Sequence, residues 1–286
     1  MLPFTVDLRG QVAVVTGGSG VLCSRMALAL AECGASVAIL GRDPAKLDKV
    51  RAAIAAAGGT ARAYSCDVLD RAALEKVGEA VARDLGPCRI LVNGAGGNHP
   101  KAVSGVEVLR PEHLRPAPGA AAPTSFFDIS AEGLQAVFGV NFVGLFIATQ
   151  VFARGMAERG EGVIINLTSM AGERPLTKVG AYGAAKAAVA NLTRWLAVHL
   201  AGVNVRVNAI SPGFFLTEQN RPLLTTPDGG YSERARKIVA HTPLGRFGEA
   251  DELIGTLLWL VSPAAAGFVT GAVIPVDGGF SAYSGV

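Results

Sequence analysis

Short apolar runs alternate with longer segments of helical periodicity along most of the chain. Runs this short, rich in valine and isoleucine, are typical of buried strands, and their alternation with helices is typical of a parallel sheet covered on both faces. The predicted strands are Val12–Thr16, Val37–Leu40, Ala61–Ser65, Ile90–Val92, Val163–Leu167, Val205–Ile210 and Ala272–Val276. The predicted helices are Met26–Glu32, Pro44–Ala57, Arg71–Leu85, Ala131–Ala157, Tyr182–Leu200 and Ala250–Val261.

About seven strands with a helix after nearly each one predict a Rossmann-like, doubly wound α/β sheet with helices on both faces. The length of 286 residues suits a single catalytic domain over residues 1–286. The pattern breaks in residues 97–125, which contain five prolines and no clear period, and we expect a long irregular insertion there. Residues 214–241 are expected to be irregular or loosely helical.

Composition narrows the function classes. Half of the residues are apolar and 17% are charged, which excludes a disordered chain. A net charge of +3 without a basic cluster argues against nucleic acid as a partner. The N-terminus lacks the long apolar core of a signal peptide, and the apolar stretch near the C-terminus, Leu257–Val261, is too short to span a bilayer. Four cysteines without zinc-type spacing predict reduced thiols and no metal site. We therefore expect a cytoplasmic protein.

The first strand–turn–helix unit carries the segment Thr16-Gly-Gly-Ser-Gly-Val-Leu-Cys23. Glycines allow the backbone to approach a pyrophosphate, and the helix N-terminus offers free N–H groups. A turn of this kind at this position predicts dinucleotide binding, with a glycine turn that binds nothing as the alternative. The candidate cofactor contacts in this turn are Gly17, Ser19, Gly20, Val21 and Leu22.

The end of the second predicted strand bears on the choice of cofactor. An acidic residue there would accept hydrogen bonds from a ribose 2′-hydroxyl, but the strand ends in Gly41 and Arg42 and the first carboxylate is Asp43. Arg42 can pair with a 2′-phosphate, which favours NADP, with NAD as the alternative.

Three residues near the fifth strand can support hydride transfer chemistry. Ser169 lies just beyond Val163–Leu167, and Tyr182 and Lys186 are four residues apart at the start of the next helix, so they share one face. The phenol can give a proton to an alkoxide, the ammonium together with a positive nicotinamide ring would lower the phenol pKa, and the serine can hydrogen bond a carbonyl. Each residue alone is unremarkable, and the hypothesis depends on their joint placement.

With these motifs the sequence resembles the short-chain dehydrogenases/reductases over nearly its whole length. Tyr182-Gly-Ala-Ala-Lys186 is similar to the family's YxxxK motif, with Ser169 thirteen residues before the tyrosine. The resemblance implies that Asn141 helps to hold a proton-relay water and that Lys186 also binds the nicotinamide ribose. Further cofactor contacts that it implies are Asp67, Val68, Asn93, Ala95, Gly96, Tyr182, Pro212, Gly213, Phe215 and Thr217.

The chain departs from the family pattern at two places. Cys23 stands where the last glycine of the dinucleotide turn is usual, and we expect a modest packing adjustment because cysteine is small. Gly94 replaces the second asparagine of the family's NNAG segment, and we expect little consequence.

Segments around 96–101, 212–221 and 275–280 resemble the D-mannonate oxidoreductase (fructuronate reductase) branch of the family. A sugar acid needs a cation for its carboxylate and polar groups for its hydroxyls. The candidate substrate residues are Asn98, His99, Lys101, Arg174, Lys178, Gln219, Asn220 and Arg221, with solvated loop residues as the alternative for each. The preferred function is thus an oxidoreductase of a sugar acid or related polyol.

Two other functions remain open. A 3-oxoacyl or general ketone reductase would use the same catalytic residues, although no basic cluster argues for a docked acyl carrier protein. A non-catalytic dinucleotide-binding redox sensor finds support only in Cys23 beside the expected pyrophosphate. The resemblance implies a homotetramer, and a small-molecule substrate is the other expected partner.

Overall fold

A computed structural model describes residues 5–116, 118–119, 121–216 and 221–285. Seven parallel strands form one sheet in the order β3-β2-β1-β4-β5-β6-β7, so the predicted doubly wound fold is confirmed. The order reverses beside β1, which creates a crevice at the carboxyl ends of β1 and β4. The strands are β1 Val12–Thr16, β2 Ser36–Gly41, β3 Thr60–Ser65, β4 Cys88–Asn93, β5 Gly162–Leu167, β6 Val205–Pro212 and β7 Val273–Val276.

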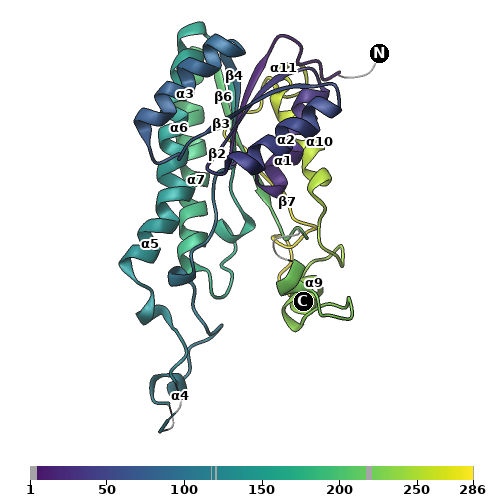
Figure 1. Cartoon of the computed structure of the whole chain (residues 1–286). Coiled ribbons are helices and arrows are strands. Elements are labelled where there is room, and N and C mark those ends of the chain that lie inside the picture. Colours follow the sequence, from purple (N-terminus) through teal and green to yellow (C-terminus); the bar gives the residue numbers. More distant parts are fainter. Residues whose placement is uncertain (1–4, 117, 120, 217–220, 286) are drawn as a thin grey trace.

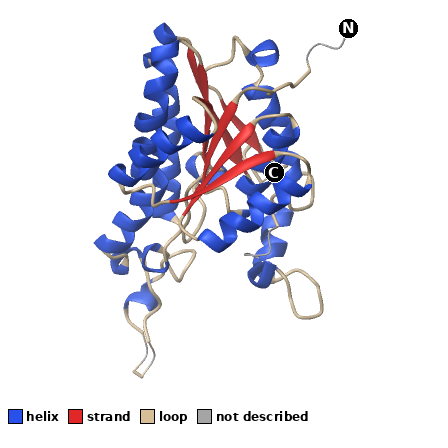
Figure 2. Cartoon of the chain, turned by 45° about the horizontal axis from the view of Figure 1, so that its top comes forward, coloured by secondary structure: helices blue, strands red, loops and turns tan. Residues whose placement is uncertain are grey.

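Helices cover both faces of the sheet (Figure 2). The α-helices are α1 Val21–Glu32, α2 Pro44–Ala56, α3 Arg71–Asp84, α4 Pro111–Leu114, α5 Ala131–Phe138, α6 Gly144–Arg159, α7 Gly180–His199, α8 Arg221–Leu224, α9 Glu233–Ala240, α10 Ile254–Val261 and α11 Pro263–Ala266. Short 3₁₀ segments are η1 Pro100–Ala102, η2 Phe126–Asp128, η4 Met170–Gly172, η5 Ala201–Val203 and η6 Ala250–Leu253, and η3 Gly139–Val143 is a π-helix.

Alternation along the strands divides the core into two layers. Val15 of β1 packs with α1, α2 and α10, whereas its neighbour Val14 packs on the opposite face with α3, α6 and α7. Met26 and Leu30 of α1 fill the first layer, and Phe152 of α6 belongs to the second. Burial of large apolar side chains on both faces stabilises the sheet and holds its carboxyl ends, where the crevice lies, in place.

The predicted helix over residues 131–157 is interrupted in the structure. α5 and α6 are joined by the π-helical turn Gly139–Val143, and Asn141 lies at its centre. The insertion of one residue per turn rotates the side chains that follow, and π-helical turns of this kind are frequent at functional sites. The apolar pattern continues through the turn, so hydropathy alone predicted one regular helix.

The helical stretch Ala131–Arg159, which includes the π-helical turn, is long enough and apolar enough to cross a membrane. Its most apolar 18-residue window has a mean hydropathy of 1.8, and 44% of that window is buried inside the protein. Its apolar side chains, such as Leu145 and Met156, pack against the sheet. Burial of this kind is typical of a core helix, so the stretch is only weak evidence for a membrane span.

The described residues between 97 and 125 form an arm that extends from the body of the molecule, with α4 near its far end (Figure 1). The base of the arm is attached to two other segments, because Ser104 N donates to Lys178 O at 2.9 Å and Lys237 of α9 pairs with Glu107 at 3.6 Å. The described part of this segment, which we expected to be irregular, contains short helical turns, and it also contacts the loop before α7.

Candidate active site

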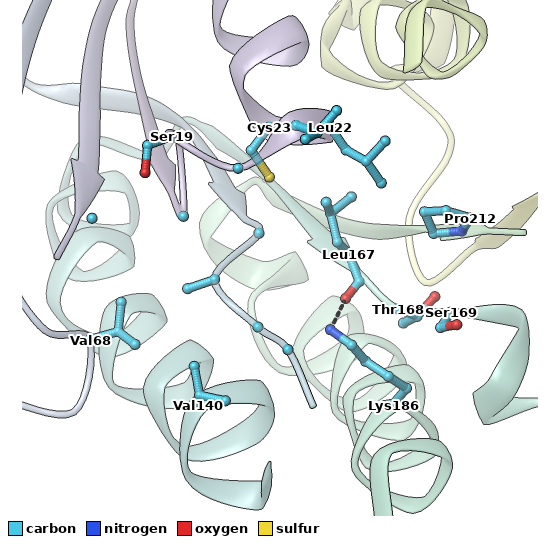
Figure 3. A pocket seen from close by; sticks show the side chains of 18 of the residues that line it. Ser19, Leu22, Cys23, Val68, Val140, Leu167, Thr168, Ser169, Lys186 and Pro212 are labelled. Carbon is cyan, nitrogen blue, oxygen red and sulfur yellow. Dashed lines mark hydrogen bonds between the residues drawn. The ribbon is translucent and has the colours of Figure 1, made fainter. Parts of the chain in front are cut away.

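A cavity of about 470 Å³ lies at the carboxyl ends of the central strands. It extends from the turn after β1 to the start of α7 (Figure 3). The lining residues are Gly17, Ser19, Gly20, Val21, Leu22, Cys23, Gly41, Arg42, Cys66, Asp67, Val68, Gly94, Ala95, Gly96, Gly97, Val140, Leu167, Thr168, Ser169, Tyr182, Lys186, Pro212 and Gly213.

The turn after β1 is shaped for close approach of a ligand backbone or phosphate. Gly17 has a φ of +64°, and a Cβ there would lie 2.8 Å from the backbone of Ala95. α1 begins at Val21, earlier than predicted, so its N-terminus faces the cavity directly. Gly20 caps this helix without a side-chain hydrogen bond, which leaves N–H groups of the first turn for an anion.

Arg42 and Asp43, which follow the end of β2, have different roles in the structure. Arg42 lines the cavity, whereas the Asp43 carboxylate accepts hydrogen bonds from Ala45 N at 3.0 Å and Lys46 N at 3.2 Å as the N-cap of α2. The carboxylate nearest to β2 is therefore used to cap a helix. This removes the main objection to Arg42 as a partner for a 2′-phosphate.

Ser169, Tyr182 and Lys186 all line the same cavity. Ser169 caps the turn η4 directly after β5, and Tyr182 and Lys186 lie in the first two turns of α7. A Cβ at Gly183 would lie 2.7 Å from Ala171 O, so η4 and α7 are in close backbone contact and hold the three side chains in one place. The predicted juxtaposition of the trio is present.

Lys186 and Asn141 are fixed by buried hydrogen bonds. Lys186 is 5% exposed, and its Nζ donates to Leu167 O at 2.9 Å (Figure 3). The Asn141 amide donates to Gly97 O and Val137 O at 2.6 and 2.8 Å, while its Oδ1 accepts from Gly97 N at 3.2 Å. Asn141 thus orders the cavity wall at Gly97 without itself lining the cavity.

Burial dominates the electrostatics of the trio. It raises the pKa of the Tyr182 phenol, against the lowering effect of its hydrogen bond with Ser169, and it lowers the pKa of Lys186 to about 8. We expected the ammonium of Lys186, together with the positive charge of a bound nicotinamide, to lower the phenol pKa. In this arrangement the phenol pKa is raised instead. Lys186 Nζ lies 5.7 Å from the centre of the Tyr182 ring and donates to Leu167 O instead.

The lowered pKa of Lys186 predicts a pH-dependent stability. Between its folded value of about 8 and its ordinary value of 10.5, the unfolded chain keeps a proton that the folded chain has released, so stability rises with pH. Without added cofactor, the free energy of unfolding should rise by ~1 kcal/mol more from about pH 7 to about pH 9 in the native protein than in Lys186→Met. Urea unfolding of both proteins at each pH measures this difference, and parallel curves would contradict it.

The two departures from the family pattern are in contact with each other. The thiol of Cys23 fills the space over Gly94, so a Cβ at position 94 would overlap Sγ. Cys23 is 4% exposed, and burial raises the pKa of its thiol to about 12. A thiol of this kind is a packing group rather than a reactive thiolate, which argues against the redox-sensor function.

Some predicted residues do not line the cavity. Asn93 is buried and donates to Thr149 Oγ1 and Asn166 Oδ1, and Phe215 is 6% exposed beside Gly248. The candidate substrate residues Asn98, His99, Lys101, Arg174, Lys178 and Arg221 also lie outside it. Lys101 lies in η1, Arg221 begins α8, and the others lie on loops. Thr217, Gln219 and Asn220 fall outside the residues that the structure describes.

Sequence reasoning missed several lining residues. Gly41, Cys66, Leu167 and Thr168 lie at or just beyond strand ends, so the rule that ligands bind at the carboxyl ends of parallel strands could have found them. Val140 could not be found in this way, because only the π-helical turn brings it to the cavity.

A dinucleotide-type cavity whose far wall carries a serine, a tyrosine and a lysine defines a class of nucleotide-dependent oxidoreductases. A family model described as enoyl-(acyl carrier protein) reductase matches residues 20–281. The chain belongs to the short-chain dehydrogenase/reductase family of NAD(P)-dependent oxidoreductases, which confirms the family resemblance and the expected enzyme class.

Individual relatives are similar over their whole length. An uncharacterized oxidoreductase, UxuB, of Bacillus subtilis is 50% identical over 286 residues, covering 100% of both chains. A Haemophilus crystal structure with bound NAD, of a protein provisionally assigned as a D-mannonate oxidoreductase, is 44% identical with a TM-score of 0.92 and 98% coverage of both chains. Gluconate 5-dehydrogenase of Gluconobacter oxydans is 32% identical, covering 98% of both chains.

Proposed function

We propose that the chain interconverts a secondary alcohol and a carbonyl on a sugar acid, such as the mannonate/fructuronate pair, or on a related polyol. The observation that carries the proposal is the placement of Ser169, Tyr182 and Lys186 on one wall of the dinucleotide-type cavity. The relatives described as mannonate and gluconate oxidoreductases support the substrate class.

The residues present fit a nicotinamide dinucleotide. Gly17 and its neighbours leave room for a pyrophosphate beside the N-terminus of α1, Asp67 and Val68 would border the adenine, and Pro212 and Gly213 the nicotinamide. When bound, the cofactor supplies or accepts the hydride. We assign Asn93 and Phe215 supporting rather than contacting roles, because both are buried behind the cavity wall.

The protein's own groups move the proton. In the reducing direction the Tyr182 phenol, which burial keeps protonated, gives its proton to the alkoxide oxygen, and the Ser169 hydroxyl donates to the same oxygen. In the oxidising direction the phenolate must take the alcohol proton, so oxidation should need higher pH than reduction. Lys186 would bind the ribose and favour the phenolate, and Asn141 would hold a relay water at Gly97.

For the cofactor we propose NADP, with NAD as the alternative that the Haemophilus relative's bound ligand favours. Arg42 lines the cavity while Asp43 is used as a helix cap, which supports a 2′-phosphate partner at Arg42. Arg42→Ala should lower kcat/KM for NADP(H) roughly 10- to 100-fold and leave that for NAD(H) within about threefold. Steady-state kinetics with both cofactors measures this, and an NAD preference unchanged by the substitution would refute the role of Arg42.

The substrate proposal is tested by a screen of hexonates, hexuronates, polyols and 3-oxoacyl thioesters, followed at 340 nm with both cofactors in both directions. Turnover of a hexonate or its keto acid with the highest kcat/KM supports the proposal. Preference for 3-oxoacyl thioesters or simple ketones would favour the general reductase function instead. Tyr182→Phe serves as the control that turnover comes from this site.

We further propose a single catalytic domain, a homotetramer and a cytoplasmic location. One sheet with all seven strands supports the single domain, and four free cysteines are consistent with a reducing compartment. Exposed apolar side chains on α6 and α7, including Phe146, Trp195 and Val198, offer surface for contact between subunits. Light scattering of the purified protein would test the assembly.

A further inference from the structure

The guanidinium of Arg174 connects the catalytic turn to the C-terminal tail. Arg174 follows Ser169 by five residues, and its backbone N donates to Met170 O at 2.8 Å, so it belongs to the turn that positions the catalytic serine. Its Nε donates to the carbonyl of Ser281 at 2.8 Å, which is 107 residues away in the sequence. Arg174 is exposed and does not line the cavity itself, but this hydrogen bond holds its side chain next to the turn whose Ser169 does.

The tail that provides this anchor is itself ordered beside the cavity. The carboxylate of Asp277, directly after β7, accepts from Gly279 N at 2.9 Å, from Ser281 N at 2.8 Å and from the Ser281 hydroxyl. A Cβ at Gly213 would lie 2.5 Å from Asp277 Cα, so the tail starts against a residue that lines the cavity. The Arg174–Ser281 contact thus joins the loops after β5 and β7 across the end of β6.

The charge of Arg174 is not neutralised within the described part of the chain. There, Lys237 pairs with Glu107 and Glu233, and Arg246 pairs with Glu252, whereas Arg174 has no carboxylate within ion-pair distance. Asp277 does not compete, because its oxygens accept from three donors of its own tail. With Nε bound to Ser281, the two terminal nitrogens of the guanidinium make no hydrogen bond to a described residue.

We propose that Arg174 is the specificity-determining residue that binds the carboxylate of the sugar-acid substrate, held in position by the carbonyl of Ser281. This inference rests on the proposed function. The guanidinium of Arg174 is planar, and its Nε is held by Ser281 O. Its two terminal nitrogens can therefore bind a carboxylate with little loss of side-chain entropy. Lys101 and Lys178, the other nearby candidates, are single point charges on flexible stems, and no side-chain hydrogen bond holds either ammonium among the described residues.

The test compares substrates that differ only in the carboxylate. Native protein and Arg174→Gln are assayed with D-mannonate against D-mannitol and with D-gluconate against D-glucitol. We expect kcat/KM for the hexonates to fall roughly 100-fold, mainly through KM, and kcat/KM for the polyols to change less than about threefold. Arg174→Lys should recover only part of the hexonate activity, because it keeps the charge and loses the fork.

Two controls separate this role from a structural one. Arg154→Gln, which neutralises an exposed cation of α6, should leave the hexonate KM nearly unchanged. Removal of residues 281–286 should raise the hexonate KM without changing polyol turnover, because it removes the anchor. Equal losses on acids and polyols, or a hexonate KM unaffected by Arg174→Gln, would overturn the inference. In either case, turnover of hexonates by the native protein would still support the proposed function. Native protein inactive on every hexonate and keto acid would refute both.

Discussion

Replacement of Tyr182 by phenylalanine is expected to lower kcat at least ~1000-fold, while the affinity for the dinucleotide changes less than about threefold. We assign the proton exchange with the substrate oxygen to the phenol, because the Lys186 amine is held by its hydrogen bond to Leu167 O. Ser169 can stabilise charge on that oxygen but is a poor proton donor. Steady-state assays in both directions give kcat, and fluorescence titration gives the cofactor Kd.

The substitution is a clean test because the ring is retained. Tyr182 packs against Phe138 and a small cluster that includes Val137 and Ala185, and phenylalanine keeps those contacts. An unchanged melting temperature in Tyr182→Phe would show that the loss is chemical. Turnover within tenfold of the native protein would refute the assignment of Tyr182 as the proton donor.

Local sequence signals were sufficient for the sheet and for the trio. Except for β3, which has the mixed sequence Thr-Ala-Arg-Ala-Tyr-Ser, the strands were apolar runs bounded by turn residues. The predicted strand positions agree with β1 to β7 within a few residues at each end. Tyr182 and Lys186 are four residues apart on one helix, and Ser169 follows a strand, so periodicity and the strand-end rule together predict their meeting.

Features that depend on distant contacts could not be predicted in this way. The π-helical turn around Asn141 has the same apolar composition as the helices beside it, so no local signal marks it. The early start of α1 at Val21 lacks a side-chain cap, which is the usual signal for a helix N-terminus. The hydrogen bond between Arg174 and Ser281 joins residues 107 positions apart. A single sequence contains no pattern that pairs them.

Cys23 and Gly94 illustrate this limit most clearly. Each residue departs from the family pattern by itself, and from the sequence we expected a minor effect at each position. In the structure, the Cys23 thiol lies in the space that a side chain at 94 would need, while Gly94 N donates to Thr16 Oγ1 at 3.1 Å. The two positions therefore form one packing unit at the centre of the cofactor cavity, and the absence of a side chain at 94 is what makes room for cysteine at 23.

This coupling predicts that Gly94→Ala will lower cofactor affinity roughly 10- to 100-fold and destabilise the protein by ~1–3 kcal/mol. The added methyl group would overlap Cys23 Sγ, and relief requires a shift of the turn that faces the pyrophosphate or of the strand end that carries Ala95 and Gly96. Cofactor titration and urea unfolding of the variant measure both effects. Gly202→Ala is the matched control, because a methyl group there meets no atom within 4 Å.

A double-mutant cycle decides whether the clash with Cys23 is the cause. Cys23→Ala alone should change cofactor affinity less than about threefold, and in Cys23→Ala/Gly94→Ala the affinity should return most of the way to the native value. Recovery will be partial, because a Cβ at 94 also lies 3.1 Å from Thr16 O, which no substitution removes. Additive losses in the double variant would show that the two positions act independently, and the shared packing unit would then be wrong.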